Sequence, residues 1–163
     1  MKEWEVSEYP DPLIEASCSF LRNPQLLTVF VTTIFKKTNA YDSISLQQTM
    51  VILTKWIKFI EALGIPFPRN FDFSFFLLGI NRALEFDHHL ATSSVIWCLY
   101  QTIHYFPSDQ RVLVVSEILK KHFFKFFFSW SPHIRDMFFY LVLYQIEHNF
   151  LIKCLCEIGL EFQ

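Results

Sequence analysis

The chain has 163 residues and a formal net charge of −2, a length that suits one domain. Apolar residues make up 52% and charged residues 18%, against about 45–50% and about 25% in average chains, which excludes intrinsic disorder. Without a basic excess, nucleic acid is not expected as a partner. Phenylalanine accounts for 20 positions, so we expect a large core that leaves some apolar surface for a partner.

Glycine is scarce, with Gly64, Gly79 and Gly159 as the only three. Tight β-hairpins and phosphate-binding loops both depend on glycine, and the prolines lie at the edges of apolar segments, as they do between helices. The composition therefore predicts an all-α fold.

The first third of the chain predicts an arm and three helices. Residues 1–10 are acidic and contain no apolar run, so they indicate a flexible arm and no signal peptide. Helices are expected over residues 11–21 and, after Asn23-Pro24, up to residue 38. Asp42 or Ser43 should cap a third helix that ends near residue 63, with Gly64 in the stop position.

The remainder predicts an extended linker over residues 65–71, which holds two prolines, and then a helix from Asp72 or Ser74 to residue 86. Gly79 lies inside this helix, so we expect a neighbouring helix to approach closely there. Further helices are expected from residue 87 to the Pro107 turn, over 109–128, over 132–148 and, more weakly, over 150–158.

The expected helices alternate with short turns, so neighbouring helices should run antiparallel. The expected starts near residues 43, 88 and 132 lie about 45 and 44 residues apart, and the units of armadillo and HEAT repeats are about 40–47 residues long. We predict stacked antiparallel helical hairpins in an armadillo/HEAT-like α-solenoid. Residues 11–163 should form a single all-helical domain, or a fragment of a longer solenoid.

The stretch over residues 126–144, FFFSWSPHIRDMFFYLVLY, predicts the tight turn between two buried helices. We expect Trp130 and Pro132 to fix this turn. Arg135 should reach back to free carbonyl groups and a carboxylate. Asp136 should complement the dipole of the helix from its first turn. These four residues are predicted to be structural.

Two segments resemble a family known only as a domain of unknown function, found in fungal and amoeboid proteins. The resemblance covers residues 85–148 and depends on Phe128-Ser129-Trp130-Ser131, Ile134-Arg135, Phe138-Phe139 and Leu141. The upstream turn Tyr105-Phe106-Pro107, followed by Arg111, is similar to the family as well. The resemblance implies a helical, armadillo-like piece of a scaffold and no site residues.

Candidate chemical groups are sparse. Asp87, His88 and His89, joined by His104, are the best metal-like cluster and would suit a metal-dependent hydrolase, but adjacent histidines on a helix diverge by about 100°. Cys154 and Cys156 lack a second pair at ligand spacing. No nucleophile motif is present. We therefore expect no catalysis, no metal and no cofactor, and free cysteines in a reducing cytoplasmic compartment.

The run over residues 123–128, FFKFFF, leaves phenylalanines pointing in every direction around a helix. Lys121, Phe124 and Phe127 are a candidate partner surface, or a face for a membrane surface. No apolar stretch approaches the ~20 residues that a membrane-spanning helix needs. The sequence thus favours a non-catalytic protein-interaction or scaffold module with an unidentified protein partner. A membrane-peripheral protein and a metal-dependent hydrolase are the alternatives.

Overall fold

The computed structural model describes residues 9–86 and 88–147. These residues form seven α-helices and one short 3-10 helix, and they contain no strand. In chain order the elements are α1 (Asp11–Phe20), α2 (Leu26–Lys37), α3 (Ser43–Ala62), α4 (Phe73–Glu85), α5 (His89–Thr102), η1 (Ile103–Tyr105), α6 (Ser108–Phe127) and α7 (Pro132–Glu147). The prediction of an all-α chain is confirmed for this part of the protein.

Local capping explains where several helices begin and end. The Asp42 carboxylate accepts a hydrogen bond from the Ile44 amide at 3.0 Å, and Asp72 does the same for the Phe75 amide at 2.9 Å, so each satisfies a free amide at a helix start. Gly64 has a φ of 67° and follows α3 in the left-handed conformation that favours glycine. The sequence predicts Asp42 and Asp72 near helix starts and Gly64 at a helix end.

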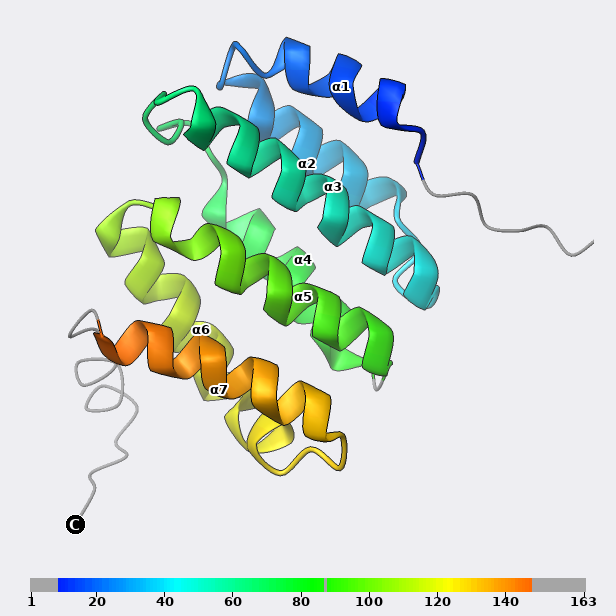
Figure 1. Ribbon diagram of the computed structural model, residues 1–163, viewed down its shortest axis with the longest axis vertical. Helices are drawn as coiled ribbons and strands as arrows, with labels where there is room; N and C mark the ends of the chain where they lie inside the picture. The colour runs from blue at the N-terminus through cyan, green and yellow to red at the C-terminus, as the bar shows by residue number, and fades with distance from the viewer. Residues whose placement is uncertain (1–8, 87, 148–163) are drawn as a thin grey trace, which may run out of the picture.

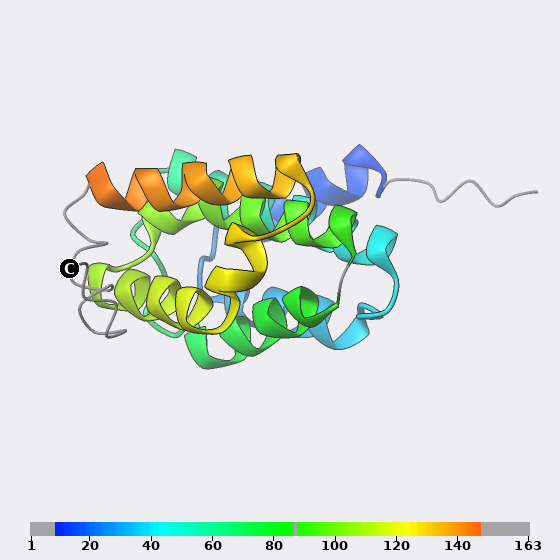
Figure 2. The same cartoon turned by 90° about the horizontal axis from the view of Figure 1, so that it is seen from below.

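The helices lie in two layers (Figures 1 and 2). One layer holds α1, α3, α5 and α7 in that order, and the other holds α2, α4 and α6. Helices α3, α5 and α7 run side by side in the same direction (Figure 1). We call these the odd layer and the even layer.

The core lies between the layers and also between neighbours within each layer. Two apolar stripes run along α3, and most of their residues are buried, including Leu53 and Ile57 on one and Ile52 and Trp56 on the other. The Trp56 indole Nε1 donates a 2.8 Å hydrogen bond to Ser17 Oγ, which ties α3 to α1. Helix α3 therefore has neighbours on both sides, which accounts for its two apolar stripes.

Much of the phenylalanine excess gathers beneath the linker that joins α3 to α4. The ring of Phe67 lies 5.1–5.4 Å from four other aromatic rings, from the linker, α4 and η1. Edge-to-face contacts of this kind stabilise a core beyond simple burial. Packing of these rings holds the proline-rich linker in place without regular structure.

The close approach predicted at Gly79 is confirmed. A Cβ built on Gly79 of α4 would lie only 2.7 Å from Cδ2 of Phe35, which belongs to α2. Glycine here allows the Phe35 ring to lie against the backbone of α4.

The structure differs from the sequence predictions at two helix ends. The fifth helix stops at Thr102 and continues as η1, before Phe106 and Pro107 make the turn. Asp136 lies beyond the first turn of α7, so its predicted place in that turn is wrong. Asp87, Cys154, Cys156, the helix expected over 150–158 and most of the N-terminal arm lie outside the described residues.

Candidate binding surfaces

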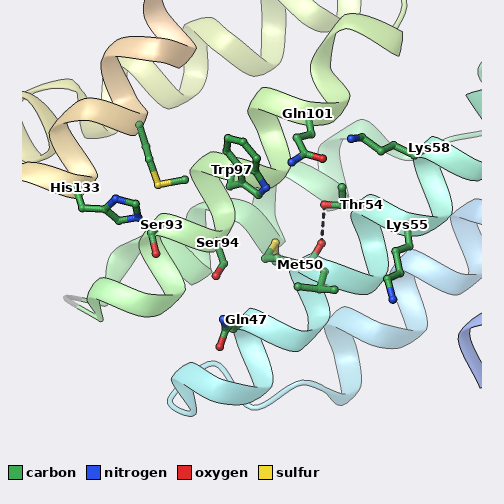
Figure 3. A pocket seen from close by; sticks show the side chains of 12 residues that line it. Gln47, Met50, Thr54, Lys55, Lys58, Ser93, Ser94, Trp97, Gln101 and His133 are labelled. Carbon is green, nitrogen blue, oxygen red and sulfur yellow. Dashed lines mark hydrogen bonds between the residues drawn. The ribbon is translucent and has the colours of Figure 1, made fainter. Parts of the chain in front are cut away.

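A groove crosses the outer face of the odd layer, over α3, α5 and α7, with a volume of about 390 Å³ (Figure 3). We call it the odd-helix groove. It is lined by Gln47, Met50, Val51, Thr54, Lys55, Lys58, Ser93, Ser94, Trp97, Gln101, His133 and Met137. The residues that α3, α5 and α7 contribute lie some 40 residues apart in the sequence from one helix to the next. Side-by-side packing of the three helices brings them together.

Apolar side chains form the centre of the groove. Trp97 of α5 is 47% exposed and stacks on Tyr100, with ring centroids 5.5 Å apart and planes at 23°. The partly buried Met137 of α7 and the buried Met50 of α3 also line the groove, and α5 lies between these two helices. Methionine and tryptophan adapt to many apolar ligands, so this centre can accept an apolar side chain.

Polar side chains surround that centre. The amides of Gln47 and Gln101 make no side-chain hydrogen bond with any described residue. Lys55 lies 3.5 Å from Asp11 of α1, whereas Lys58 makes no ion pair within the described part of the chain. No aspartate or glutamate lines the groove, so its electrostatic character is positive.

A second exposed surface lies at the end of α6, where Phe124 and Phe128 are 64% and 72% exposed. Their rings stack with centroids 6.3 Å apart. Phe127, less exposed, meets the edge of Phe139 from α7 at 5.7 Å. We call Lys121, Phe124, Phe127, Phe128 and Phe139 the aromatic end. It contains the three residues that the sequence proposed as a partner surface.

Two lysines at the aromatic end are engaged by other groups of the same chain. Lys125 Nζ donates to the Leu84 carbonyl at 2.8 Å and thereby caps the last turn of α4. Lys121 pairs at 3.8 Å with Glu117, one turn earlier on α6. Lys125 therefore serves the contact between α4 and α6 and is not a free surface charge.

The turn before α7 is held by an arginine. Arg135 Nη1 donates a 2.5 Å hydrogen bond to the Ser129 carbonyl, and Pro132 occupies the first position of α7. Within the described residues no carboxylate pairs with Arg135. Trp130 is 86% exposed, with His89 as its ring neighbour at 6.4 Å. Burial of the Trp130 indole therefore does not hold this turn, and the expectation that Trp130 fixes the turn stays a prediction.

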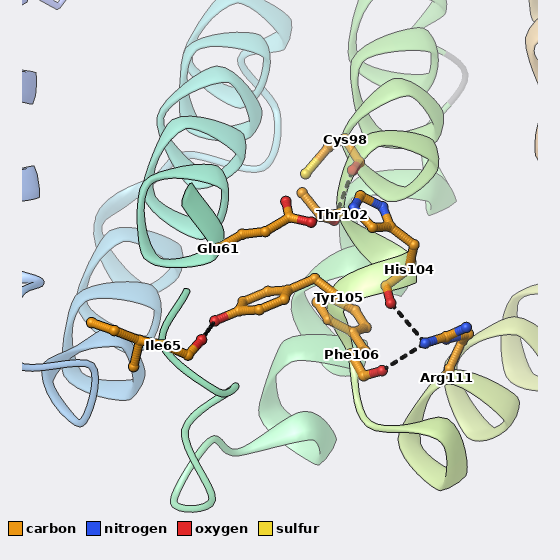
Figure 4. A network of polar contacts seen from close by, with 8 residues as sticks. All are labelled: Glu61, Ile65, Cys98, Thr102, His104, Tyr105, Phe106 and Arg111. Carbon is orange, nitrogen blue, oxygen red and sulfur yellow. Dashed lines mark hydrogen bonds and ion pairs between the residues drawn. The ribbon is translucent and has the colours of Figure 1, made fainter. Parts of the chain in front are cut away.

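A similar arginine holds the preceding turn (Figure 4). Arg111 Nη2 donates to the carbonyls of His104, at 2.7 Å, and Phe106, at 3.1 Å. In the same network His104 Nε2 lies 2.6 Å from Glu61 Oε1, and the Tyr105 hydroxyl donates to the Ile65 carbonyl. Burial, and then the charge of Glu61, raise the pKa of Tyr105. The network fastens η1 and α6 to the end of α3.

The histidines proposed as metal ligands are not brought together. His88 and His89 lie at the start of α5, and His104 lies beyond its other end, about 20 Å away at 1.5 Å per residue. His104 is engaged with Glu61, while His89 faces His133 with ring centroids 5.8 Å apart. No group of three metal-ligating side chains occurs among the described residues. His88, His89 and His104 of the candidate cluster therefore do not form a single site, and Asp87 lies outside the described residues.

The two described cysteines are buried, unpaired thiols. Burial raises the pKa of Cys98 to about 11, and burial also raises the pKa of Cys18. A thiolate is the reactive form of cysteine. Neither side chain is therefore suited to act as a nucleophile at neutral pH.

A family model described as "Protein of unknown function (DUF1765)" matches residues 27–146. The chain belongs to this family. The family match runs from α2 to the last turn of α7, so both the odd-helix groove and the aromatic end lie within the DUF1765 region. The match covers all but the last two of residues 85–148, for which the resemblance was stated, and extends it towards the N-terminus.

No curated protein and no solved structure is similar enough to this DUF1765 chain to count as a match. Within the described part of the chain, no helix is both long and apolar enough to cross a membrane.

The odd-helix groove was not predicted from the sequence. Trp97 is the signal that could have pointed to it, because a tryptophan beside Gln101 interrupts the buried positions of α5. Locating Lys58 and Met137 beside it requires knowledge of which helices are neighbours.

Proposed function

We propose that this chain is a non-catalytic protein-interaction module, built as a stretch of armadillo/HEAT-like α-solenoid. Two features support the solenoid. Helices α3, α5 and α7 run in one direction within one layer, and they begin at residues 43, 89 and 132, which is 46 and then 43 residues apart. Stacked hairpins of this size present extended surfaces for partners.

The observation that carries the proposal is the odd-helix groove. It combines an apolar centre, formed by the exposed Trp97 and the partly buried Met137, with uncommitted amides and a lysine. Protein-binding sites are typically composed of aromatic and methionine side chains surrounded by a polar rim. Among the described residues, the carboxylate–histidine pair of Glu61 and His104 instead helps to hold a turn.

The free thiols of Cys18 and Cys98 suit a protein of the reducing cytoplasm, and we include that location in the proposal.

The experiment compares two double variants of the whole chain. Trp97→Ala with Met137→Ala removes the apolar centre of the groove. Val29→Ala with Leu78→Ala removes two exposed side chains from the even layer and is the matched control. Circular dichroism checks that both variants remain folded.

Proteins recovered from the cells that make this chain are quantified by mass spectrometry, and candidates are then purified and titrated. The proposal predicts at least one purified partner that binds the wild-type and the even-layer variant alike and binds the groove variant at least about tenfold more weakly, as for a hot-spot loss of about 1.4 kcal/mol or more. If every partner binds all three proteins equally, the groove is not the interaction site.

The exposure of Phe124 and Phe128 supports a second candidate function, attachment to a membrane surface through the aromatic end. Flotation with vesicles that contain phosphatidylserine tests it. Binding that is lost in Phe124→Ser with Phe128→Ser, and kept in the groove variant, favours this function. Absence of flotation at low salt excludes it.

A further inference from the structure

The odd-helix groove is part of a longer furrow. A second hollow of about 510 Å³ lies between α1 and α3 and shares Gln47, Val51 and Lys55 with it. The two hollows together cross the outer face of all four odd-layer helices. Because packed helices lie about 8–10 Å apart, the furrow from α3 to α7 is about 16–20 Å long. An extended chain covers about 3.3 Å per residue, so about five or six residues span it.

The side chains of the furrow suit an extended backbone. An extended peptide presents amide and carbonyl groups that no intramolecular bond satisfies, whereas a helix satisfies its own. Gln47 and Gln101 each offer one amide donor group and one carbonyl acceptor, and neither is engaged by the described residues. Such side chains can bind the backbone of a peptide without reading its sequence.

The charge of the odd-helix groove favours an acidic occupant, whereas Asp11 lines the second hollow of the furrow. The chain has a net charge of −2, yet the groove is lined by lysines and a histidine and by no carboxylate. Lys55 is partly neutralised by Asp11 at 3.5 Å, which leaves Lys58 as the unpaired cation at the α3 end among the described residues. Complementary charge fixes the direction and register of a bound segment.

Figure 3 gives the order of these features across the groove: Lys55 and Lys58 on α3, Trp97 on α5 in the middle, and His133 on α7. An apolar side chain at the centre would thus lie about one helix spacing from the lysine end, which is two or three extended residues.

We propose that the odd-helix groove binds an extended peptide segment of a partner protein, with an acidic side chain on Lys58 and an apolar side chain against Trp97 and Met137, two or three residues away. This inference rests on the proposed function and specifies the chemistry of the partner at the same surface.

The test is selection from a displayed library of random nine-residue peptides on the whole wild-type chain. Each selected peptide is then tested for binding to Trp97→Ala and to the control Leu78→Ala, whose side chain is exposed on α4. Peptides that lose binding to Trp97→Ala and keep binding to Leu78→Ala are called Trp97-dependent. The proposal predicts that Trp97-dependent peptides are enriched in aspartate or glutamate two or three positions from an aromatic or aliphatic residue. It also predicts that selection on Lys58→Glu replaces the acid by lysine or arginine at the same spacing.

Trp97-dependent peptides without an acidic preference, or with one that Lys58→Glu leaves unchanged, would overturn this inference and leave the interaction function standing. Recovery of no Trp97-dependent peptide would also overturn this inference, whereas the interaction function would fail only if the purified partners bind the groove variant and the wild-type protein equally. A second copy of this chain in the groove would appear in sedimentation as dimerisation lost in Trp97→Ala, and vesicle binding with the same dependence would indicate a membrane. Either result overturns the peptide proposal.

Discussion

Gly79→Ala tests the packing of the even layer. Alanine is favoured over glycine inside a helix by about 1 kcal/mol, so at an exposed position the change would stabilise the protein. At Gly79 the new Cβ would lie 2.7, 2.9 and 3.0 Å from three ring carbons of Phe35. Ordinary contact begins near 3.4 Å, so the ring would have to retreat by about 0.7 Å.

The Phe35 ring has little freedom to retreat, because it contacts two rings of α4, those of Phe75 at 6.5 Å and Phe76 at 6.2 Å between centroids. Forcing atoms into a packed region costs about 1–3 kcal/mol. With the gain in helix propensity subtracted, Gly79→Ala should destabilise the protein by about 1 kcal/mol.

The assay is urea unfolding followed by circular dichroism, in a double-mutant cycle with Phe35→Ala. Removing the ring removes all three close atoms, so in that background Gly79→Ala should stabilise by about 1 kcal/mol, and the coupling energy should be about 2 kcal/mol. Leu78→Ala, at the exposed neighbouring position, serves as the control and should show no coupling to Phe35. If Gly79→Ala stabilises the wild-type protein as much as it stabilises the Phe35→Ala variant, the close approach of α2 and α4 is not as described.

Three further predictions concern the turns, the even layer and the thiols. Arg135→Ala should lower the free energy of unfolding by about 1.5–3 kcal/mol, because the Ser129 carbonyl loses a charged donor. As the control, Asp136→Ala at an exposed position should change it by less than about 0.5 kcal/mol. Equal urea midpoints for the two variants would refute the role of Arg135 in holding the turn. His122 is hydrogen-bonded to Asn81 at 3.0 Å, and burial, followed by the charges of Lys125 and Lys121, lowers its pKa. The folded state therefore binds fewer protons than the unfolded state, so the free energy of unfolding should fall as the pH drops below about 6.5. In a pH series of unfolding curves, His122→Gln should lack this pH-dependent loss of stability. Cys98, with its pKa raised to about 11, should be alkylated by iodoacetamide at pH 8 only after unfolding, and equal rates of modification in native and denatured protein, read by mass spectrometry of its peptide, would contradict its burial.

The helices themselves could be predicted from the sequence because their signals are local. Asp42, Asp72, Gly64 and Pro132 mark ends that depend on a few neighbouring backbone groups. The glycine inside α4 correctly indicated a close neighbour, since alanine would otherwise be preferred there.

The binding surfaces could not be predicted in the same way, because they depend on which helices become neighbours. Trp130 follows the buried Phe126 by four residues, yet its indole is exposed, and no local pattern distinguishes the two. The pair of Glu61 and His104 is 43 residues apart in the chain. Likewise, the groove combines Lys58, Trp97 and Met137 only after α3, α5 and α7 have stacked.

The most direct test of the proposed interaction is a charge exchange between Lys58 and the acidic residue of one selected peptide, with affinity measured by fluorescence anisotropy. Lys58→Glu alone, or the peptide with its acid changed to lysine, should each weaken binding about five- to tenfold, and the two changes together should restore affinity to within about threefold of the original pair. If the doubly reversed pair binds as weakly as the two separate losses combined, the acid does not lie on Lys58 and the proposed mode of binding in the odd-helix groove is wrong.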